Sequence, residues 1–339
     1  MDICELVSLS VKQNASDLHL SAGHLPMLRV NGNLRACEEG KLDAIKLQEQ
    51  ILSRLSAEQL AVFQSQGQLD CALSWSDGVR LRANIFQQRS GISAAFRFIQ
   101  TKIPDSSALK IPDAIVEISH RSDGLVIIAG ATGSGKSTTM AALIAGINQR
   151  EHRHIITLED PIEFIHHSNS SLIQQREIGN HAASFSQGLR AALRQDPDII
   201  LLGELRDAET IRLALTAAET GHLVFATLHT RSAIQSMERI IDVFSAEEKQ
   251  FVSSQLANTL QAVVCQRLVP DLKGSRVAAY EVLINTPAVS NMIRENKRHQ
   301  LQSLLQTGSA LGMQTMEQNI NALVNQGMIG ESYYSPDIR

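Results

Sequence analysis

The first part of the chain switches between two spacings of its hydrophobic residues. Apolar residues at every third or fourth position predict a helix over 2–14, and strict alternation of polar and apolar residues predicts a strand over 16–21. The pair Asn31-Gly32 separates two short apolar stretches, at 27–30 and 34–37, and predicts a hairpin. A helix, a strand and a hairpin are therefore expected in this order.

A similar alternation of helices and strands continues to residue 100. Helical spacing over 42–55 predicts a second helix, and Ser56 with Gln59 fits a capping box that would open a third. Residues 1–100 are thus expected to form a small α+β domain with two hairpin-rich halves. The strands expected in its second half are 69–75, 79–86 and 92–99, with turns at Ser76-Asp77-Gly78 and Ser90-Gly91.

Two prolines, Pro104 and Pro112, mark a change of pattern after residue 100. Each disfavours helical backbone in the residue before it, so the segment 101–113 is expected to be a linker. In 114–339 strands first alternate with helices, which predicts an α/β fold with a mostly parallel sheet. Beyond 246 the chain, including the charge-free run 250–266, is expected to be largely helical. The elements expected after the linker are strands 125–129, 154–159, 199–203, 222–228 and 277–284, and helices 136–149, 207–220 and 232–244.

The composition removes several classes of function. The chain has 339 residues, with 31 Lys and Arg against 35 Asp and Glu, and a formal net charge of −4. Without a basic surplus, no direct nucleic-acid partner is expected. The four cysteines form no C-x-x-C pair, so no zinc is expected. The N-terminus lacks the pattern of a signal peptide and no apolar run is long enough to span a bilayer, so the protein is expected in the cytoplasm.

A glycine-rich segment follows the strand expected at 125–129 and precedes the helix expected at 136–149. Its sequence GATGSGKS fits the pattern G-x-x-x-x-G-K-[ST] of a phosphate-binding loop. Glycines let backbone N–H groups surround a phosphate, Lys136 would meet the β- and γ-oxygens of ATP, and Ser137 would bind Mg²⁺. The predicted nucleotide-binding residues here are Gly130, Ala131, Thr132, Gly133, Ser134, Gly135, Lys136, Ser137 and Thr138.

Polar residues follow three other strands of the expected sheet. Because ligands bind beyond the carboxyl ends of parallel strands, these residues are expected near the phosphate loop. The acids Glu159, Asp160 and Glu163 compete for the role of general base, and the sequence does not choose among them. Glu204 is expected to hold Mg²⁺ directly or through water, and His229 to sense the γ-phosphate.

Other charged residues have a plainer interpretation when each is taken alone. His152, His154, His166 and His167 straddle a strand without the spacing of a metal site, which favours a structural role. The arginines Arg190 and Arg194 are four residues apart on an expected helix. Alternation places Arg82 and Arg97 on the exposed side of their strands. Solvated charges are the commoner interpretation of all four arginines.

Taken together, four segments resemble the secretion ATPase superfamily. GATGSGKSTT (130–139), TLEDPIEF (157–164), DPDIILLGELRD (196–207) and TGHLVFATLHT (220–230) are similar to its Walker A, Asp, Walker B and His boxes, in order and spacing. The segment ASDLHLSAGHLPMLRVNGNLR (15–35) resembles the PilT-type twitching-motility ATPases of type IV pili. The resemblance covers almost the whole chain.

The resemblance implies an architecture and a set of roles. It implies a PAS-like N-terminal domain, a RecA-like ATPase core with a mainly helical C-terminal part, and assembly into a homohexamer that uses ATP and Mg²⁺. Glu163 would be the general base and Glu204 the Walker B acid. Arg82 and Arg97 would reach the γ-phosphate from a neighbouring domain or subunit. The core arginines that would face phosphate are Arg190, Arg194 and Arg206.

The resemblance also implies partners and a direction of work. The motor would act at the inner-membrane face on a pilus platform protein, and on pilin indirectly. The chain has neither the four-cysteine insertion nor the longer N-terminal region usual in assembly and type II secretion ATPases, which favours retraction. Against this, the retraction motif AIRNLIRE appears as AVSNMIRE at 288–295, with Ser290 in place of an arginine.

Other functions therefore stay open. They are a pilus assembly or secretion ATPase of the same superfamily, a RecA-type nucleic-acid motor, and a nucleotide-binding scaffold with little turnover.

Overall fold

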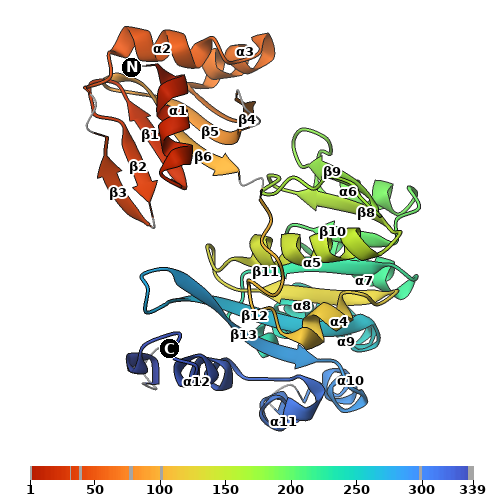
Figure 1. Cartoon of the computed structure of the whole chain (residues 1–339). Helices are drawn as coiled ribbons and strands as arrows, with labels where there is room; N and C mark the ends of the chain where they lie inside the picture. Colours follow the sequence, from red (N-terminus) through yellow and green to blue (C-terminus); the bar gives the residue numbers. More distant parts are fainter. Residues whose placement is uncertain are drawn as a thin grey trace. The chain divides into compact units, whose positions relative to one another are not determined.

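The computed structural model describes residues 2–30, 32–37, 40–75, 79–99, 102–297 and 300–334. The chain divides into two compact units, Met1–Thr101 and Lys102–Arg339, coloured red to orange and orange to blue in Figure 1. The expected turn at Ser76-Asp77-Gly78 and the first residue of the expected Asn31-Gly32 turn lie outside the described residues.

In its described residues the first unit is a six-stranded antiparallel sheet with three α-helices. The strand order is β3-β2-β1-β6-β5-β4, and the pairing of β1 with β6 joins the two hairpin-rich regions into one sheet. Its elements are α1 (Ile3–Lys12), β1 (Asp17–Ser21), β2 (Met27–Val30), β3 (Asn33–Ala36), α2 (Ala44–Leu52), α3 (Ala57–Gln66), β4 (Gln68–Ser74), β5 (Arg80–Gln88) and β6 (Gly91–Ile99).

Local sequence signals account for these elements. The predicted capping box is confirmed at the start of α3, where Ser56 and Gln59 each bind the other's backbone N–H. Alternation places Leu81, Ile85 and Phe96 in a core under the helices, where each is almost fully buried.

The second unit is a seven-stranded mixed sheet in the part of the chain that the structure describes. The strand order is β13-β12-β7-β11-β10-β8-β9, and all neighbours are parallel except β12 and β13. Its elements are α4 (Asp113–Ile118), β7 (Gly124–Ala129), α5 (Lys136–Arg150), β8 (His154–Glu159), β9 (Leu172–Glu177), α6 (Phe185–Ala192), β10 (Ile199–Leu202), α7 (Ala208–Glu219), β11 (Leu223–Leu228), α8 (Ala233–Asp242), α9 (Ala246–Thr259), β12 (Leu260–Pro270), β13 (Arg276–Ile284), α10 (Pro287–Arg294), α11 (Leu301–Thr307), η3 (Gly308–Leu311), α12 (Met316–Asn325) and η4 (Glu331–Tyr334).

Helices cover both faces of this sheet (Figure 1). Residues of α4 and α5 pack on one face, and residues of α6 to α11 pack on the other. The two faces alternate along the central strand, since Leu125 and Ile127 of β7 contact one layer and Val126 and Ile128 contact the other. Because β7, β8, β10 and β11 are parallel, their carboxyl ends meet at one edge of the sheet, which we call the carboxyl edge.

The prediction of a largely helical chain beyond 246 is wrong for the segment 250–266. Only its first part is helical, in α9, and β12 begins at Leu260. The strand is buried between β7 and β13, so its apolar residues do not alternate with polar ones, and periodicity cannot distinguish it from a buried helix. Strand β9 was also not expected, whereas α6 corresponds to the helix expected to carry Arg190.

None of the helices in the described residues is both long and apolar enough to cross a membrane.

Candidate functional site

The glycine-rich segment forms a tight loop between β7 and α5. Gly133 and Gly135 have φ values of 77° and 89°, which side chains rarely permit. A Cβ on Gly130 would lie 2.5 Å from the carbonyl oxygen of Gln266, and one on Gly135 would lie 2.7 Å from the Nε2 of Gln266. The loop thus requires these glycines both for its shape and for its close approach to β12.

Polar groups inside and beside this loop suit an anion. The helix α5 starts at Lys136 without a side-chain cap, which leaves the first-turn N–H groups to a ligand or solvent. The buried Oγ of Ser134 has no hydrogen-bond partner among the described residues. These features match a loop that binds phosphate oxygens.

Lys136 is folded back onto the loop. Its Nζ donates hydrogen bonds to the carbonyl oxygens of Gly130, at 2.8 Å, and Ala131, at 3.0 Å. Burial lowers the pKa of Lys136, while the negative charges of Glu204 and Glu163 oppose this shift. Both carboxylates therefore act electrostatically on the lysine.

One cavity at the carboxyl edge brings together three of the predicted site residues. Ser137 from the start of α5, Glu163 from the loop after β8 and Glu204 from the loop after β10 all line it. Its volume is about 80 Å³, which is room for ordered water. The parallel strands bring these residues together although they are far apart in sequence.

Glu159 and Glu163 differ in environment. Glu159 accepts hydrogen bonds from Thr157 Oγ1, at 2.6 Å, and Gln175 Nε2, at 3.1 Å. Burial raises the pKa of Glu159, and these hydrogen bonds only partly oppose the shift. Both acids line the cavity, but Glu163 is exposed whereas Glu159 is half-buried. The two acids are thus a sequestered carboxyl and an accessible carboxylate.

Glu204 lies between an arginine and a histidine. Its Oε2 is 2.8 Å from Nη2 of Arg206, and its Oε1 is 3.5 Å from Nε2 of His229. The hydrogen bond to Glu204 raises the pKa of Arg206, and Asp160 adds to this from 3.9 Å. The structure therefore brings His229 and Arg206 together on the carboxylate.

Gly203 precedes this carboxylate where many phosphate-loop ATPases have an aspartate. A Cβ at this position would lie 3.2 Å from the Leu158 carbonyl oxygen and 3.4 Å from the Glu159 Cα, which is a tight fit. The Thr227 hydroxyl donates a hydrogen bond to the Gly203 carbonyl. Close packing of β10 between its neighbours accounts for glycine here.

None of the predicted arginines lines this cavity, although Arg206 contacts Glu204 beside it. Arg190 lies on α6 and pairs with Glu209 at 2.5 Å, with both side chains more than half exposed. Arg194 was expected on the same helix, but α6 ends at Ala192 and Arg194 lies exposed in the following turn. In the monomer both are surface charges.

Arg82 and Arg97 belong to the first unit. They are directly opposite each other in the register of β5 and β6, and their side chains are 42% and 70% exposed. Arg97 pairs with Asp17 at 3.0 Å, and Arg82 pairs with Asp70 at 3.7 Å. The predicted exposure of both arginines is confirmed.

Several residues around the cavity were not predicted to belong to the site. Gln175 holds Glu159, Thr227 holds Gly203, and His166 lines the cavity. Burial, with a smaller contribution from His167, lowers the pKa of His166 to about 4, so its ring is neutral at neutral pH. Gln175 lies on a strand that was not expected, whereas His166 lies two residues after the Asp box and could have been found there.

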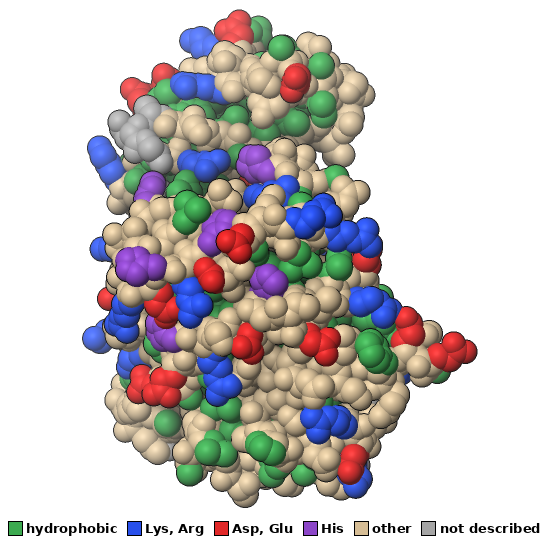
Figure 2. Space-filling view, turned by 90° about the vertical axis from the view of Figure 1, so that its right-hand side faces the viewer, with side chains coloured by type: hydrophobic (Ala, Val, Ile, Leu, Met, Phe, Trp, Pro, Cys, Tyr) green, Lys and Arg blue, Asp and Glu red, His purple; other side chains and the backbone are tan. Residues whose placement is uncertain are grey.

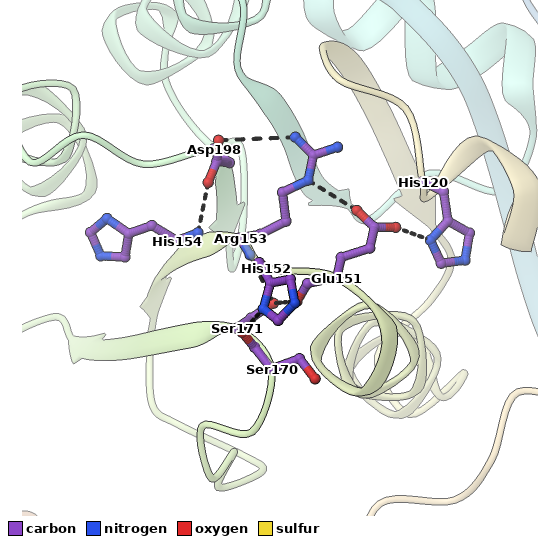
Figure 3. A network of polar contacts seen from close by, with 8 residues as sticks. All are labelled: His120, Glu151, His152, Arg153, His154, Ser170, Ser171 and Asp198. Atoms are coloured by element: carbon purple, nitrogen blue, oxygen red, sulfur yellow. Dashed lines mark hydrogen bonds and ion pairs between the residues drawn. The ribbon is translucent and has the colours of Figure 1, made fainter.

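The remaining histidines of the expected strand region lie at the opposite, amino edge of the sheet. Figure 3 shows His120, His152 and His154 spread around Glu151, Arg153 and Asp198 rather than converging on one point. His154 Nδ1 contacts the Asp196 carbonyl at 2.9 Å, and His152 Nδ1 contacts the Ser170 carbonyl at 3.1 Å. These rings bind backbone groups, which is a structural use.

Comparisons with known proteins agree with this geometry. The family model described as "Type II/IV secretion system protein" matches residues 2–275. The chain belongs to this family. Within the family it is similar to PilT-type proteins along its whole length.

Its relatives include two close in size. The chain is 47% identical to the type IV pilus retraction ATPase PilT of Pseudomonas aeruginosa, over 97% of this chain and 96% of that protein. It is 50% identical to the uncharacterized protein YggR of Escherichia coli K12, over 97% and 100%. Identity to type II secretion system protein E of Aeromonas hydrophila is 31%, over 80% of this chain and 55% of that protein.

A solved structure of this secretion family matches the fold as well. The crystal structure of the pilus retraction motor PilT with bound ADP superimposes with a TM-score of 0.92 at 42% identity, covering 100% of this chain and 98% of that one. The chain is therefore a PilT-like member of the family.

Proposed function

We propose that this protein is a Mg²⁺-dependent ATPase that works as a homohexameric motor in type IV pilus retraction. The observation that carries the proposal is the meeting of Ser137, Glu163 and Glu204 on one cavity beside the phosphate loop. Whole-length similarity to a retraction ATPase, and the lower identity to a type II secretion ATPase, support the direction of work.

We assign a role to each group in or beside the cavity. Ser137 binds Mg²⁺, and Glu204 holds it directly or through water. Bound Mg²⁺ offsets charge on the phosphates of ATP. Glu163 accepts the proton of the attacking water, while Arg206 and His229 orient Glu204. The nucleotide-binding set is Gly130, Ala131, Thr132, Gly133, Ser134, Gly135, Lys136, Ser137 and Thr138, with Arg190, Arg194 and Arg206.

Glu163 is the proposed base for a physical reason. A general base must be ionised and able to meet water, and Glu163 is exposed on the cavity. Glu159 is held by Thr157 and Gln175, and its raised pKa disfavours ionisation. We assign Glu159 to shaping the cavity wall.

The two units have separate proposed identities. Residues 1–100 are a PAS-like domain, 101–113 a linker, and 114–339 a RecA-like ATPase domain with a helical C-terminal region. Exposure leaves Arg82 and Arg97 accessible to the γ-phosphate of a nucleotide on another subunit of the hexamer. The motor would act in the cytoplasm at the inner membrane through a pilus platform protein, and on pilin indirectly.

A nucleic-acid motor is the less supported alternative. Among the described side chains on the face drawn in Figure 2, Lys and Arg are interspersed with Asp and Glu, and no large basic area is visible. A backbone-binding strip would need clustered positive charge. Stimulation of turnover by DNA would support this alternative.

The assembly alternative rests on Ser290. Its hydroxyl contacts the Ala257 carbonyl at 2.8 Å and Asn285 Oδ1 at 3.0 Å, which ties α10 to the end of α9. Serine thus holds α10 where the retraction motif has an arginine. Pilus length in cells that carry Ser290→Arg would test whether this difference affects direction.

The test of the proposal is ATP turnover over a protein concentration series, with mass measured by light scattering in the same samples. We expect turnover to rise as a hexamer forms and to vanish in Glu204→Ala. Asp242→Ala is the control, since it removes an exposed carboxylate paired with Lys249 on α9. A monomer that binds ATP and does not hydrolyse it would contradict the motor and favour the scaffold.

A further inference from the structure

Three polar side chains are buried directly behind the phosphate loop. Gln266 of β12, Thr139 of α5 and Tyr280 of β13 are each at most 2% exposed. Gln266 and Tyr280 are register partners, and both lie in strands that are otherwise largely apolar. Buried polar groups are costly unless they bind one another, so their presence together needs an explanation.

One end of this group touches the phosphate loop. The Gln266 side chain and carbonyl lie against Gly135 and Gly130, so closely that neither glycine has room for a Cβ. The Thr139 hydroxyl donates to Gln266 Oε1 at 2.7 Å, and Thr139 lies in the first turn of α5. A shift of the loop therefore moves atoms that are in contact with Gln266.

The other end touches the segment that leads from the first unit into the second. The Tyr280 hydroxyl donates to the Leu109 carbonyl at 3.1 Å. Leu109 belongs to a compact turn closed by backbone hydrogen bonds from Leu109 N to Asp105 O and from Ile111 N to Ser106 O. Ile111 and Leu109 pack on the same apolar cluster as Tyr280.

Gln266 joins the two ends, because it accepts a hydrogen bond from Thr139 and lies directly opposite Tyr280 in the register of β12 and β13. Burial raises the pKa of Tyr280 to about 12, and the nearby Thr139 hydroxyl opposes this shift. Each hydroxyl carries one proton, so Thr139 can donate to Gln266 or to Tyr280 but not to both. Donation to Tyr280 requires the Gln266 amide to turn and donate to Thr139 instead. The residue to which Thr139 donates thus determines which hydrogen bonds Gln266 and Tyr280 can make.

We infer that Gln266, Thr139 and Tyr280 are positioning residues that couple the phosphate loop to the segment 105–111. The inference rests on nucleotide binding in the proposed function. In this arrangement a shift of the phosphate loop on nucleotide binding changes the hydrogen bonds of these side chains and so moves the segment 105–111, which leads to the first unit. A purely structural role would call only for apolar residues of matching size.

Hydrogen exchange provides the test. We expect Mg-ADP to change the exchange rate of the amides of 105–111 in the wild-type protein by about fivefold or more. In Tyr280→Phe, which keeps the ring and removes the hydroxyl, the same amides should exchange equally with and without Mg-ADP. Thr139→Val is the second variant and should behave in the same way. Mg-ADP affinity is measured by calorimetry for each protein, so that exchange is compared at equal saturation.

Ser119→Ala is the matched control. It also removes a buried hydroxyl, one that bonds within α4 to the Val116 carbonyl and contacts none of the three side chains. It should keep the full response to Mg-ADP. If wild-type protein binds Mg-ADP without any change in amide exchange at 105–111, the inference is overturned and the proposed function is unaffected. A full response in Tyr280→Phe or Thr139→Val has the same meaning. Wild-type protein that does not bind Mg-ADP would overturn the proposed function with it.

Discussion

At each edge of the central sheet a glutamate lies between an arginine and a histidine. At the carboxyl edge Glu204 contacts Arg206 at 2.8 Å and His229 at 3.5 Å. At the amino edge Glu151 contacts Arg153 at 2.9 Å and His120 (Figure 3). The two carboxylates are similarly buried, with side chains 20% and 22% exposed.

The surroundings of the two glutamates differ. Glu204 lines a cavity together with Ser137 and Glu163. Around Glu151 the backbone is also hydrogen-bonded to a side chain, since Ser171 Oγ donates to the Glu151 carbonyl and accepts from Arg153 N. A glutamate between an arginine and a histidine is therefore no sign of function by itself. What separates the edges is whether the carboxylates converge on a space that a ligand can enter.

The largest expected effect concerns the two acids at the carboxyl edge. We expect Glu163→Gln to lower kcat by about 10²- to 10⁴-fold, because it removes the general base. Glu159→Gln keeps an oxygen acceptor for Thr157 and should lower kcat far less. Steady-state ATP hydrolysis at saturating nucleotide measures both. A larger loss in Glu159→Gln would reverse the assignment.

At the amino edge the expected effect is on stability. Glu151→Ala leaves His120 and Arg153, each about a quarter exposed, without their shared acceptor. We expect the free energy of unfolding to fall by about 1–2 kcal/mol, measured by urea denaturation. Turnover per folded protein should be unchanged. A loss of turnover at full stability would mean that the two edges are not separate in function.

The pH dependence of Glu151 sharpens the same contrast. Burial alone would raise its pKa, but hydrogen bonds and charges from His120 and Arg153 outweigh burial and hold the pKa below the ordinary 4.5. A carboxyl of this kind stabilises the fold above about pH 4.5 and loses this effect as the pH falls through its folded pKa. The stability difference between wild-type protein and Glu151→Gln should therefore shrink below pH 4.5. A difference that grows on acidification would show the opposite sign of shift.

The smallest expected effect is on the stability of Arg190→Ala. The pair of Arg190 and Glu209 is more than half exposed, so its loss should change the free energy of unfolding by no more than about 0.5 kcal/mol. If Arg190 faces phosphate in the assembled motor, turnover falls although the melting temperature barely moves. Unchanged turnover would leave Arg190 as a surface charge.

Much of the fold follows from local signals in the sequence. The phosphate loop with its flanking strand and helix, and the capping box at Ser56, are set by residues that are neighbours in the chain. Strand β12 was not predictable in this way, because its character comes from burial between β7 and β13. Short-range periodicity does not carry that information.

The site residues also divide into those that local motifs predict and those that depend on the folded chain. Motifs at strand ends pointed to Glu163, Glu204 and His229, since parallel strands bring their carboxyl ends together. Motifs could not distinguish Glu159 from Glu163, because the difference comes from Gln175 on a strand far along the chain. Pairings such as that of Arg206 with Glu204 likewise depend on side-chain directions that only the folded chain sets.

The register of the first unit has a further consequence. It places Arg82 directly opposite Arg97, and like charges in that position repel. Asp17 compensates Arg97 only in part, since it also lies 3.9 Å from Arg29. Asp70 lies 3.7 Å from Arg82, and because both side chains are well exposed it also compensates only in part, so some repulsion between the two arginines remains on this face. A polyanion that binds over the two arginines would reduce their repulsion. The free energy released in this way would add to the affinity of the sheet for phosphate.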